Sequence, residues 1–117
     1  GDSPAICDCC LEDGMGADEY VSRFKAIVKE FSQGDEIILM GDIQGGSPLT
    51  NAMNELAVAG FLPSSAVFAG MNLPMAMTAF MGLESGDFES VRASLVDEAR
   101  RGVAEIVIAD DEEEEDL

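Results

Sequence analysis

Apolar residues follow two kinds of pattern along this chain, one typical of helices and one typical of short buried strands. Helical spacing of apolar residues predicts helices over residues 17–31, 47–59 and 87–101, and a Met- and Ala-rich segment predicts another over 74–81. Short apolar runs between these segments predict strands, over residues 5–11, 36–40, 65–69 and 103–108. Strands that alternate with helices favour an α/β fold, with a mainly parallel sheet covered by helices on both faces.

The junction GDIQGGSPLTN after the second predicted strand carries candidate chemistry. Ser47 suits the N-cap of the following helix, and Pro48 suits its first turn. Gly45 and Gly46 allow the backbone to approach a ligand closely and to adopt positive φ. Free N–H groups at the positive end of this helix would bind an anion, with Asp42 beside them at the end of the strand. Junctions of this composition also occur without a ligand, and the spacing alone leaves both interpretations open.

A second junction of the same kind follows the third predicted strand. Asn72 is expected to cap the next helix, with Pro74 in its first turn. Because parallel strands end at the same edge of a sheet, the two junctions are expected to form neighbouring rims of one crevice.

The charge of the chain restricts its partners. The 117 residues carry 24 acidic and 6 basic side chains, a formal net charge of −18. This balance argues against binding to nucleic acid or to an anionic membrane surface, and it allows a basic protein partner. Residues 1–109 are expected to form one domain, and residues 110–117 an acidic, solvated tail. The sequence shows neither a run of about 20 apolar residues nor a signal-like start, so a cytoplasmic location is expected.

The sulfur-containing residues are expected to be structural. Cys7, Cys9 and Cys10 lack a fourth thiolate or an imidazole for a zinc site, because the sequence has no histidine, and they do not form a CxxC pair. We therefore expect small buried cysteines and no metal. The methionines of the third predicted helix are expected to fill the core: Met75, Met77 and Met81.

The ordered pair of junctions resembles the mannose-type enzyme IIA domain of the bacterial phosphoenolpyruvate:sugar phosphotransferase system. The resemblance rests on Asp42-x-x-Gly45-Gly46-Ser47-Pro48 followed by Gly70-x-Asn72-Leu73-Pro74-Met75, and it extends to about Ile108. Members of this family carry phosphate on a histidine at the end of their first strand. That strand and its helix would precede Gly1, so the chain looks like the family without its first strand–helix unit.

The resemblance implies a phosphocarrier that passes phosphate from the carrier protein HPr to enzyme IIB during sugar uptake, and that meets the membrane only through the sugar permease. Asp42 would orient the histidine, while Ser47 and the N–H groups around Gly45 and Gly46 would hold the phosphoryl oxygens. The rim of the site would be shaped by Asn72, Leu73 and Pro74. No cofactor is implied. The family's parallel strands run in the order 2-1-3-4, and its last strand is antiparallel and exchanged between two subunits. Residues 103–108 would then join a homodimer.

Two other hypotheses remain open at this point. A regulatory or phosphorylation-incompetent binding domain of the same fold would account for the absent histidine. An unrelated enzyme acting on a small anion would have only Asp42, Ser47 and the cysteines for chemistry. A histidine upstream of Gly1 would favour the phosphocarrier.

Overall fold

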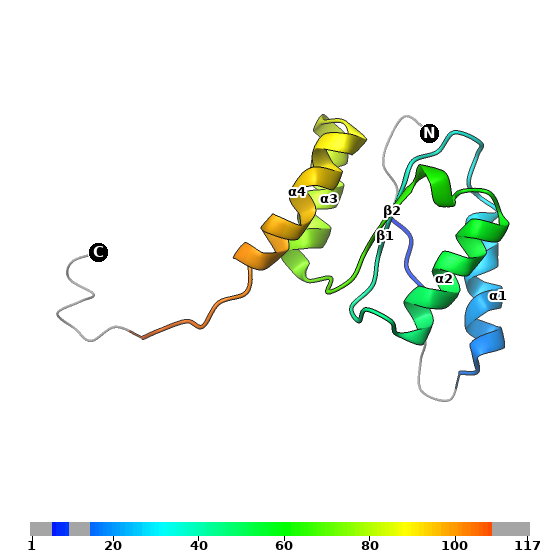
Figure 1. Cartoon of the computed structure of the whole chain (residues 1–117), viewed down its shortest axis with the longest axis horizontal. Helices are drawn as coiled ribbons and strands as arrows, with labels where there is room; N and C mark the ends of the chain where they lie inside the picture. The colour runs from blue at the N-terminus through cyan, green and yellow to red at the C-terminus, as the bar shows by residue number, and fades with distance from the viewer. Residues whose placement is uncertain (1–5, 10–14, 109–117) are drawn as a thin grey trace.

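The computed structural model describes residues 6–9 and 15–108, which form an α/β fold (Figure 1). Two parallel strands pair side by side, with Ile37 opposite Ser65 and Met40 opposite Phe68. None of the helices in the described part of the chain is long and apolar enough to cross a membrane. In chain order the elements are α1 (Ala17–Val28), β1 (Ile37–Met40), α2 (Ser47–Val58), the 3₁₀ turn η1 (Leu62–Ser64), β2 (Ser65–Phe68), α3 (Leu73–Ser85) and α4 (Phe88–Arg101).

Helices cover both faces of the strands, as the alternating pattern predicts. Along β1, Ile37 and Leu39 pack against a cluster from α1, α2 and the segment after α2, whereas Ile38 and Met40 pack against a cluster from α3 and α4. This follows from the two-residue period of a strand, which sends successive side chains to opposite faces. The strands accordingly lie between the α1–α2 pair and the α3–α4 pair in Figure 1. The buried members of the two clusters are Phe24, Val28, Ala52, Leu56 and Phe61, and Met75, Ala79, Val91, Leu95 and Ala99.

Two helices end at other positions than the sequence predicts. Helix α1 stops at Val28, because the Glu30 and Phe31 N–H groups donate to carbonyls three residues back, which tightens the last turn. Helix α3 continues through Gly82, which the sequence pattern marks as a break. A Cβ at Gly82 would lie 2.8 Å from Val91 Cγ2, so this glycine lets α3 and α4 approach each other closely.

Of the two helix caps that the sequence analysis predicts, Asn72 is confirmed and Ser47 is not, and Asp87 forms a further cap. The Asn72 side chain accepts a hydrogen bond from the Met75 N–H, and the Asp87 side chain accepts one from the Ser90 N–H. Ser47 as N-cap is wrong: Gly46 is the N-cap of α2, and Ser47 is its first helical residue. Gly46 has an extended ψ of 149°, and helical backbone begins at Ser47, one residue earlier than predicted.

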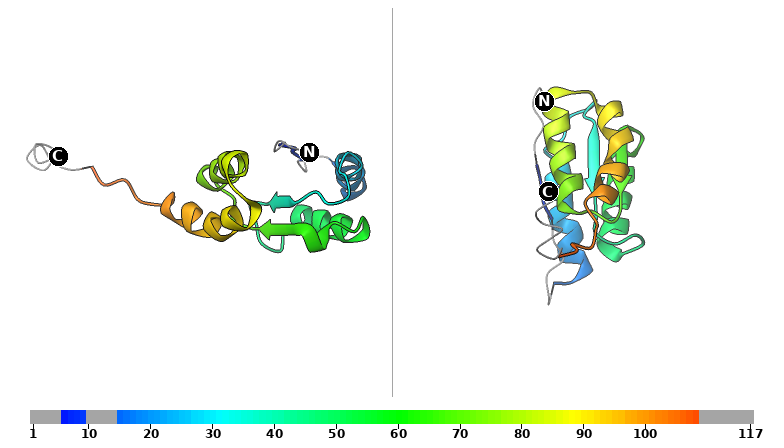
Figure 2. Two further views of the ribbon diagram at one scale, coloured as in Figure 1. Left: turned by 90° about the horizontal axis from the view of Figure 1, so that it is seen from above. Right: turned by 90° about the vertical axis from the view of Figure 1, so that its left-hand side faces the viewer.

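The described residues form neither of the two terminal strands that the sequence analysis predicts. Residues 6–9 are not in a strand, and the rest of the predicted strand over 5–11 lies outside the described residues. Residues 103–108 are exposed and form no strand; they leave the end of α4 and run away from the helices (Figure 2). No described strand of the same chain lies beside them. The acidic tail, residues 110–117, lies outside the described residues.

Burial corrects part of the expectation for the sulfur-containing residues. Met75 is 2% exposed and belongs to the core, whereas Met77 and Met81 are 50% and 60% exposed. The expectation of core filling is therefore wrong for both. Cys7 is exposed and Cys9 is partly buried, and Cys10 lies outside the described residues.

Candidate functional site at the carboxyl ends of the strands

The two predicted junctions meet at the carboxyl ends of β1 and β2. Beyond the last paired residues, the Gly41 N–H donates to the Phe68 carbonyl at 2.9 Å, and the Met71 N–H donates to the Gly41 carbonyl at 2.9 Å. The strand ladder therefore continues to Gly41, which is bonded to the end of β2 and, through Met71, to the loop that follows it. This arrangement brings the two loops together, as expected for strands that end at one edge of a sheet.

Gly41 is a site-forming residue that the sequence analysis did not single out. A Cβ at this position would lie 2.9 Å from Leu49 Cδ1, in the buried contact between the loop and the first turn of α2. A glycine directly after a strand, followed by an apolar residue in the first turn of the next helix, is the signal that could have revealed it. Gly41 thus sets how closely α2 approaches the end of β1.

The glycine loop presents backbone donors at the start of α2. Gly45 has φ +76°, the left-handed conformation that favours glycine. The Gly46 N–H donates to the Ile43 carbonyl at a long 3.3 Å, which closes the turn. The N–H groups of Gly45, Ser47 and Leu49 donate to no acceptor among the described residues. These three N–H groups at the start of α2 are therefore available to an anion, and the Gly46 N–H is shared with the turn.

The Asp42 and Ser47 side chains are both exposed beside this loop. Asp42 makes no hydrogen bond or ion pair within the described part of the chain. The Ser47 hydroxyl accepts a 3.4 Å hydrogen bond from the Asn51 side-chain amide, so its own proton stays free to donate. Both groups can therefore reach a bound molecule without breaking a strong internal bond.

Asn72 holds the second loop together instead of presenting free polar atoms. Its Oδ1 accepts from the Met75 N–H at 3.1 Å, and its Nδ2 donates to the Ala99 carbonyl at 2.8 Å. Of the other predicted rim residues, Leu73 is 71% exposed. Pro74 packs against the end of α4, where a Cβ on Gly102 would overlap the proline ring. Asn72 and Pro74 therefore fix the start of α3 to the end of α4, and Leu73 forms an apolar rim.

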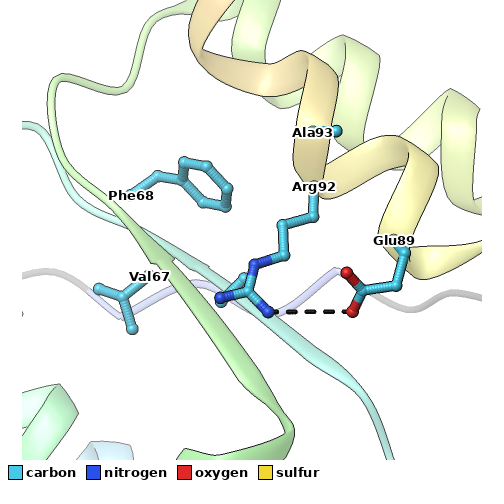
Figure 3. A pocket seen from close by; sticks show the side chains of 6 residues that line it. Val67, Phe68, Glu89, Arg92 and Ala93 are labelled. Atoms are coloured by element: carbon cyan, nitrogen blue, oxygen red, sulfur yellow. Dashed lines mark ion pairs between the residues drawn. The ribbon is translucent and has the colours of Figure 1, made fainter.

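A hollow beside β2 is lined by residues other than those of the candidate site. It has a volume of about 440 Å³ and is lined by Ala66, Val67, Phe68, Glu89, Arg92 and Ala93. Figure 3 shows the Arg92 side chain extended over β2, paired with Glu89 at 3.9 Å. Within residues 6–9 and 15–108, no group of three His, Cys, Asp or Glu side chains is placed to hold a metal ion.

The structure brings the exposed Asp42 and the backbone donors at the start of α2 to one edge of the strands. A comparison with known families bears on the same chain. Residues 1–96 match the EIIA-man family, whose description is "PTS system fructose IIA component". The match covers α1, both strands, α2, α3 and the first part of α4. The chain belongs to this family of sugar phosphotransferase system IIA components.

Proposed function

We propose that this chain is the phosphocarrier domain of a sugar phosphotransferase system, which accepts a phosphoryl group from HPr in the cytoplasm and passes it to enzyme IIB. The main support is the meeting of the two strand-end loops beside the free N–H groups of α2, in a chain of the IIA family. Backbone donors held in place by a strand and a helix can stabilise the charge of a phosphoryl group without a metal.

Each residue of the loop has its own role in phosphoryl transfer. In a phosphorylated histidine, one ring nitrogen carries the phosphate. The Asp42 carboxylate accepts a hydrogen bond from the other ring nitrogen and so orients the imidazole. The N–H groups of Gly45 and Ser47 and the Ser47 hydroxyl hold the phosphoryl oxygens, and Gly46 supplies a shared donor. Leu73 and Pro74 form the rim on which a partner protein lies. In each transfer one phosphorus–nitrogen bond breaks as another forms. The imidazole must come from outside this sequence, because the 117 residues contain no histidine.

The absence of histidine favours a second candidate, a regulatory or phosphorylation-incompetent binding domain of the same fold. Such a domain would keep the loops and the partner surface while carrying no phosphate. Phosphorylation of the complete natural protein distinguishes the two functions.

The test is Asp42→Asn in the complete natural protein, incubated with phosphoenolpyruvate, enzyme I and HPr. We expect phosphate to be gained about tenfold more slowly or worse, since an amide orients the imidazole poorly, with an unchanged melting temperature. The matched control is Glu36→Gln, because Glu36 is an exposed acid directly before β1, at the other end of the strand from Asp42. Unchanged kinetics in Asp42→Asn would remove Asp42 from the site. A wild-type protein that gains no phosphate would overturn the phosphocarrier and favour the binding domain.

A further inference from the structure

Tyr20 of α1 is a buried side chain whose hydroxyl reaches the start of α2. It is 3% exposed, and its hydroxyl donates to the Pro48 carbonyl at 2.8 Å, 28 residues further along the chain. Its ring stacks on Phe24 with the ring centroids 6.5 Å apart. A phenylalanine would fill the same space, so packing does not account for the hydroxyl. The hydroxyl acts on the first turn of the helix that supplies the N–H donors of the candidate site.

The carbonyl that Tyr20 binds belongs to the same peptide group as one of these donors. A trans peptide points its C=O and its N–H in opposite directions, so the Pro48 carbonyl and the Leu49 N–H lie on opposite sides of one planar unit. In a helix the N–H side faces the amino end, where the candidate site lies. The Leu49 N–H donates to no acceptor among the described residues. Tyr20 therefore binds one side of this peptide, while the other side keeps its donor for a ligand.

The Pro48 carbonyl has an acceptor role without Tyr20. In helical geometry it faces the N–H of Ala52, four residues further along α2. The Tyr20 hydroxyl is thus a second donor to the same oxygen. Hydrogen bonds in series polarise one another, so a donor on the carbonyl makes the N–H of the same peptide a stronger donor to an anion. The bond also fixes the plane of the peptide, and with it the direction of the Leu49 N–H.

We propose that Tyr20 is a positioning residue for phosphoryl transfer, which orients and strengthens the Leu49 N–H as a donor to a phosphoryl oxygen. This role rests on the proposed function, because it takes the loop before α2 as the phosphate site. A residue of α1, outside the loop, thus tunes the site through one peptide group. Since Tyr20 is buried, it does not reach HPr or enzyme IIB, and its hydroxyl affects the rate of transfer and not the binding of either partner.

The test compares Tyr20→Phe with Ser65→Ala in the complete natural protein. Each change removes one hydroxyl that donates to a backbone carbonyl, but Ser65 binds Phe61 at 2.7 Å, at the amino end of β2 and away from the site. We expect only Tyr20→Phe to shift the NMR resonance of the Leu49 amide nitrogen, because that peptide loses a donor on its oxygen. Binding of inorganic phosphate, followed at the same resonance, should weaken about two- to threefold.

The rate of phosphate gain from phospho-HPr gives a second readout. We expect Tyr20→Phe to lower kcat about two- to threefold and to leave KM for HPr unchanged, with Ser65→Ala close to wild type. All proteins are assayed well below their melting temperatures, so that a loss of folded protein does not lower kcat.

An unchanged Leu49 resonance in Tyr20→Phe would overturn the role of Tyr20, as would equal losses of kcat and of phosphate affinity in the two variants. A raised KM at constant kcat would overturn it too, because it would place Tyr20 in partner binding. A wild-type protein that gains no phosphate contradicts the phosphocarrier alone, and the phosphate titration then decides the role of Tyr20. If the wild type also binds no inorganic phosphate at Leu49, both proposals fail.

Discussion

At the scale of single residues, the short Asn72 side chain makes two hydrogen bonds with different roles. Its oxygen caps α3, and its amide group bonds the Ala99 carbonyl on α4, 27 residues further along the chain. A side chain with only one of these functions would leave either the first turn of α3 or the end of α4 without its partner. Asn72 therefore positions the rim of the site and the end of α4.

We predict that Asn72→Ala lowers the free energy of unfolding by about 2 kcal/mol, from one cap and one further hydrogen bond. Asn72→Asp should be less harmful, because it keeps the capping oxygen, but it should still lose the bond to the Ala99 carbonyl. Urea unfolding of the complete protein measures both. Asn54→Ala is the control, since Asn54 is exposed on α2 and makes no side-chain hydrogen bond within the described residues. Equal stabilities of Asn72→Ala and Asn54→Ala would contradict the double role.

The sequence predicts Asn72 as a cap but not its second bond. Capping is local, because a side-chain oxygen bonds an N–H three residues away, and the pattern Asn-x-Pro carries that information. The bond to Ala99 depends on how α3 and α4 pack, which no local pattern encodes. The same holds for Gly41. This position requires a residue without a side chain because Leu49 lies close to it.

At the scale of elements, α4 starts with an ionised cap. The Ser90 N–H donates to Asp87 Oδ1 at 2.8 Å, and the Ser90 hydroxyl donates to Oδ2 at 3.0 Å. These hydrogen bonds, the backbone one first, lower the pKa of Asp87 below its ordinary value of 3.8. A lowered pKa in the folded state means that the cap stabilises the fold above the unfolded pKa, and that this contribution is lost as pH falls through the folded pKa.

We therefore predict a pH-dependent effect of Asp87→Ala. The urea midpoint of the variant should lie below that of the wild type at neutral pH. The gap should shrink as pH falls from 3.8 through the lower pKa of the folded state, because the Asp87 carboxylate takes up a proton first in the unfolded chain and then in the folded one. Measuring both midpoints from neutral pH down to strongly acid pH checks this. A gap that stays constant over the whole range would mean that the ionised form of Asp87 is not what stabilises α4.

The elements themselves differ in how well the sequence predicts them. Helices α2 and α4 match their predicted ranges closely. In α4, helical apolar spacing is combined with a strong cap. The sequence could not show that Gly82 lies inside α3, because a glycine that breaks a helix and one that allows close packing look alike. The exposure of Met77 and Met81 was missed for a similar reason: a helix that is apolar on all sides does not reveal which face is buried.

At the scale of the whole molecule, the described sheet leaves backbone groups unpaired. It has two strands, so β1 and β2 each present one free edge within the described residues. Residues 103–108 supply an apolar segment that pairs with no strand of the described residues. Its apolar side chains are strongly exposed: Val103 73%, Ile106 89%, Val107 75% and Ile108 88%. Free strand edges and an exposed apolar segment are both features that proteins usually cover.

We therefore predict that the complete protein is a dimer in which residues 103–108 of each subunit contact the other, as the family resemblance implies. Replacing both Ile106 and Ile108 by Glu should shift the protein to monomers, because the dimer would bury the new carboxylates between its subunits. Sedimentation measurements over a range of concentrations would show this shift. Val58→Glu is the matched control: Val58 is 83% exposed on α2, so its replacement adds an acid without touching the segment. A monomeric wild type, or equal dissociation in the control, would contradict the exchange.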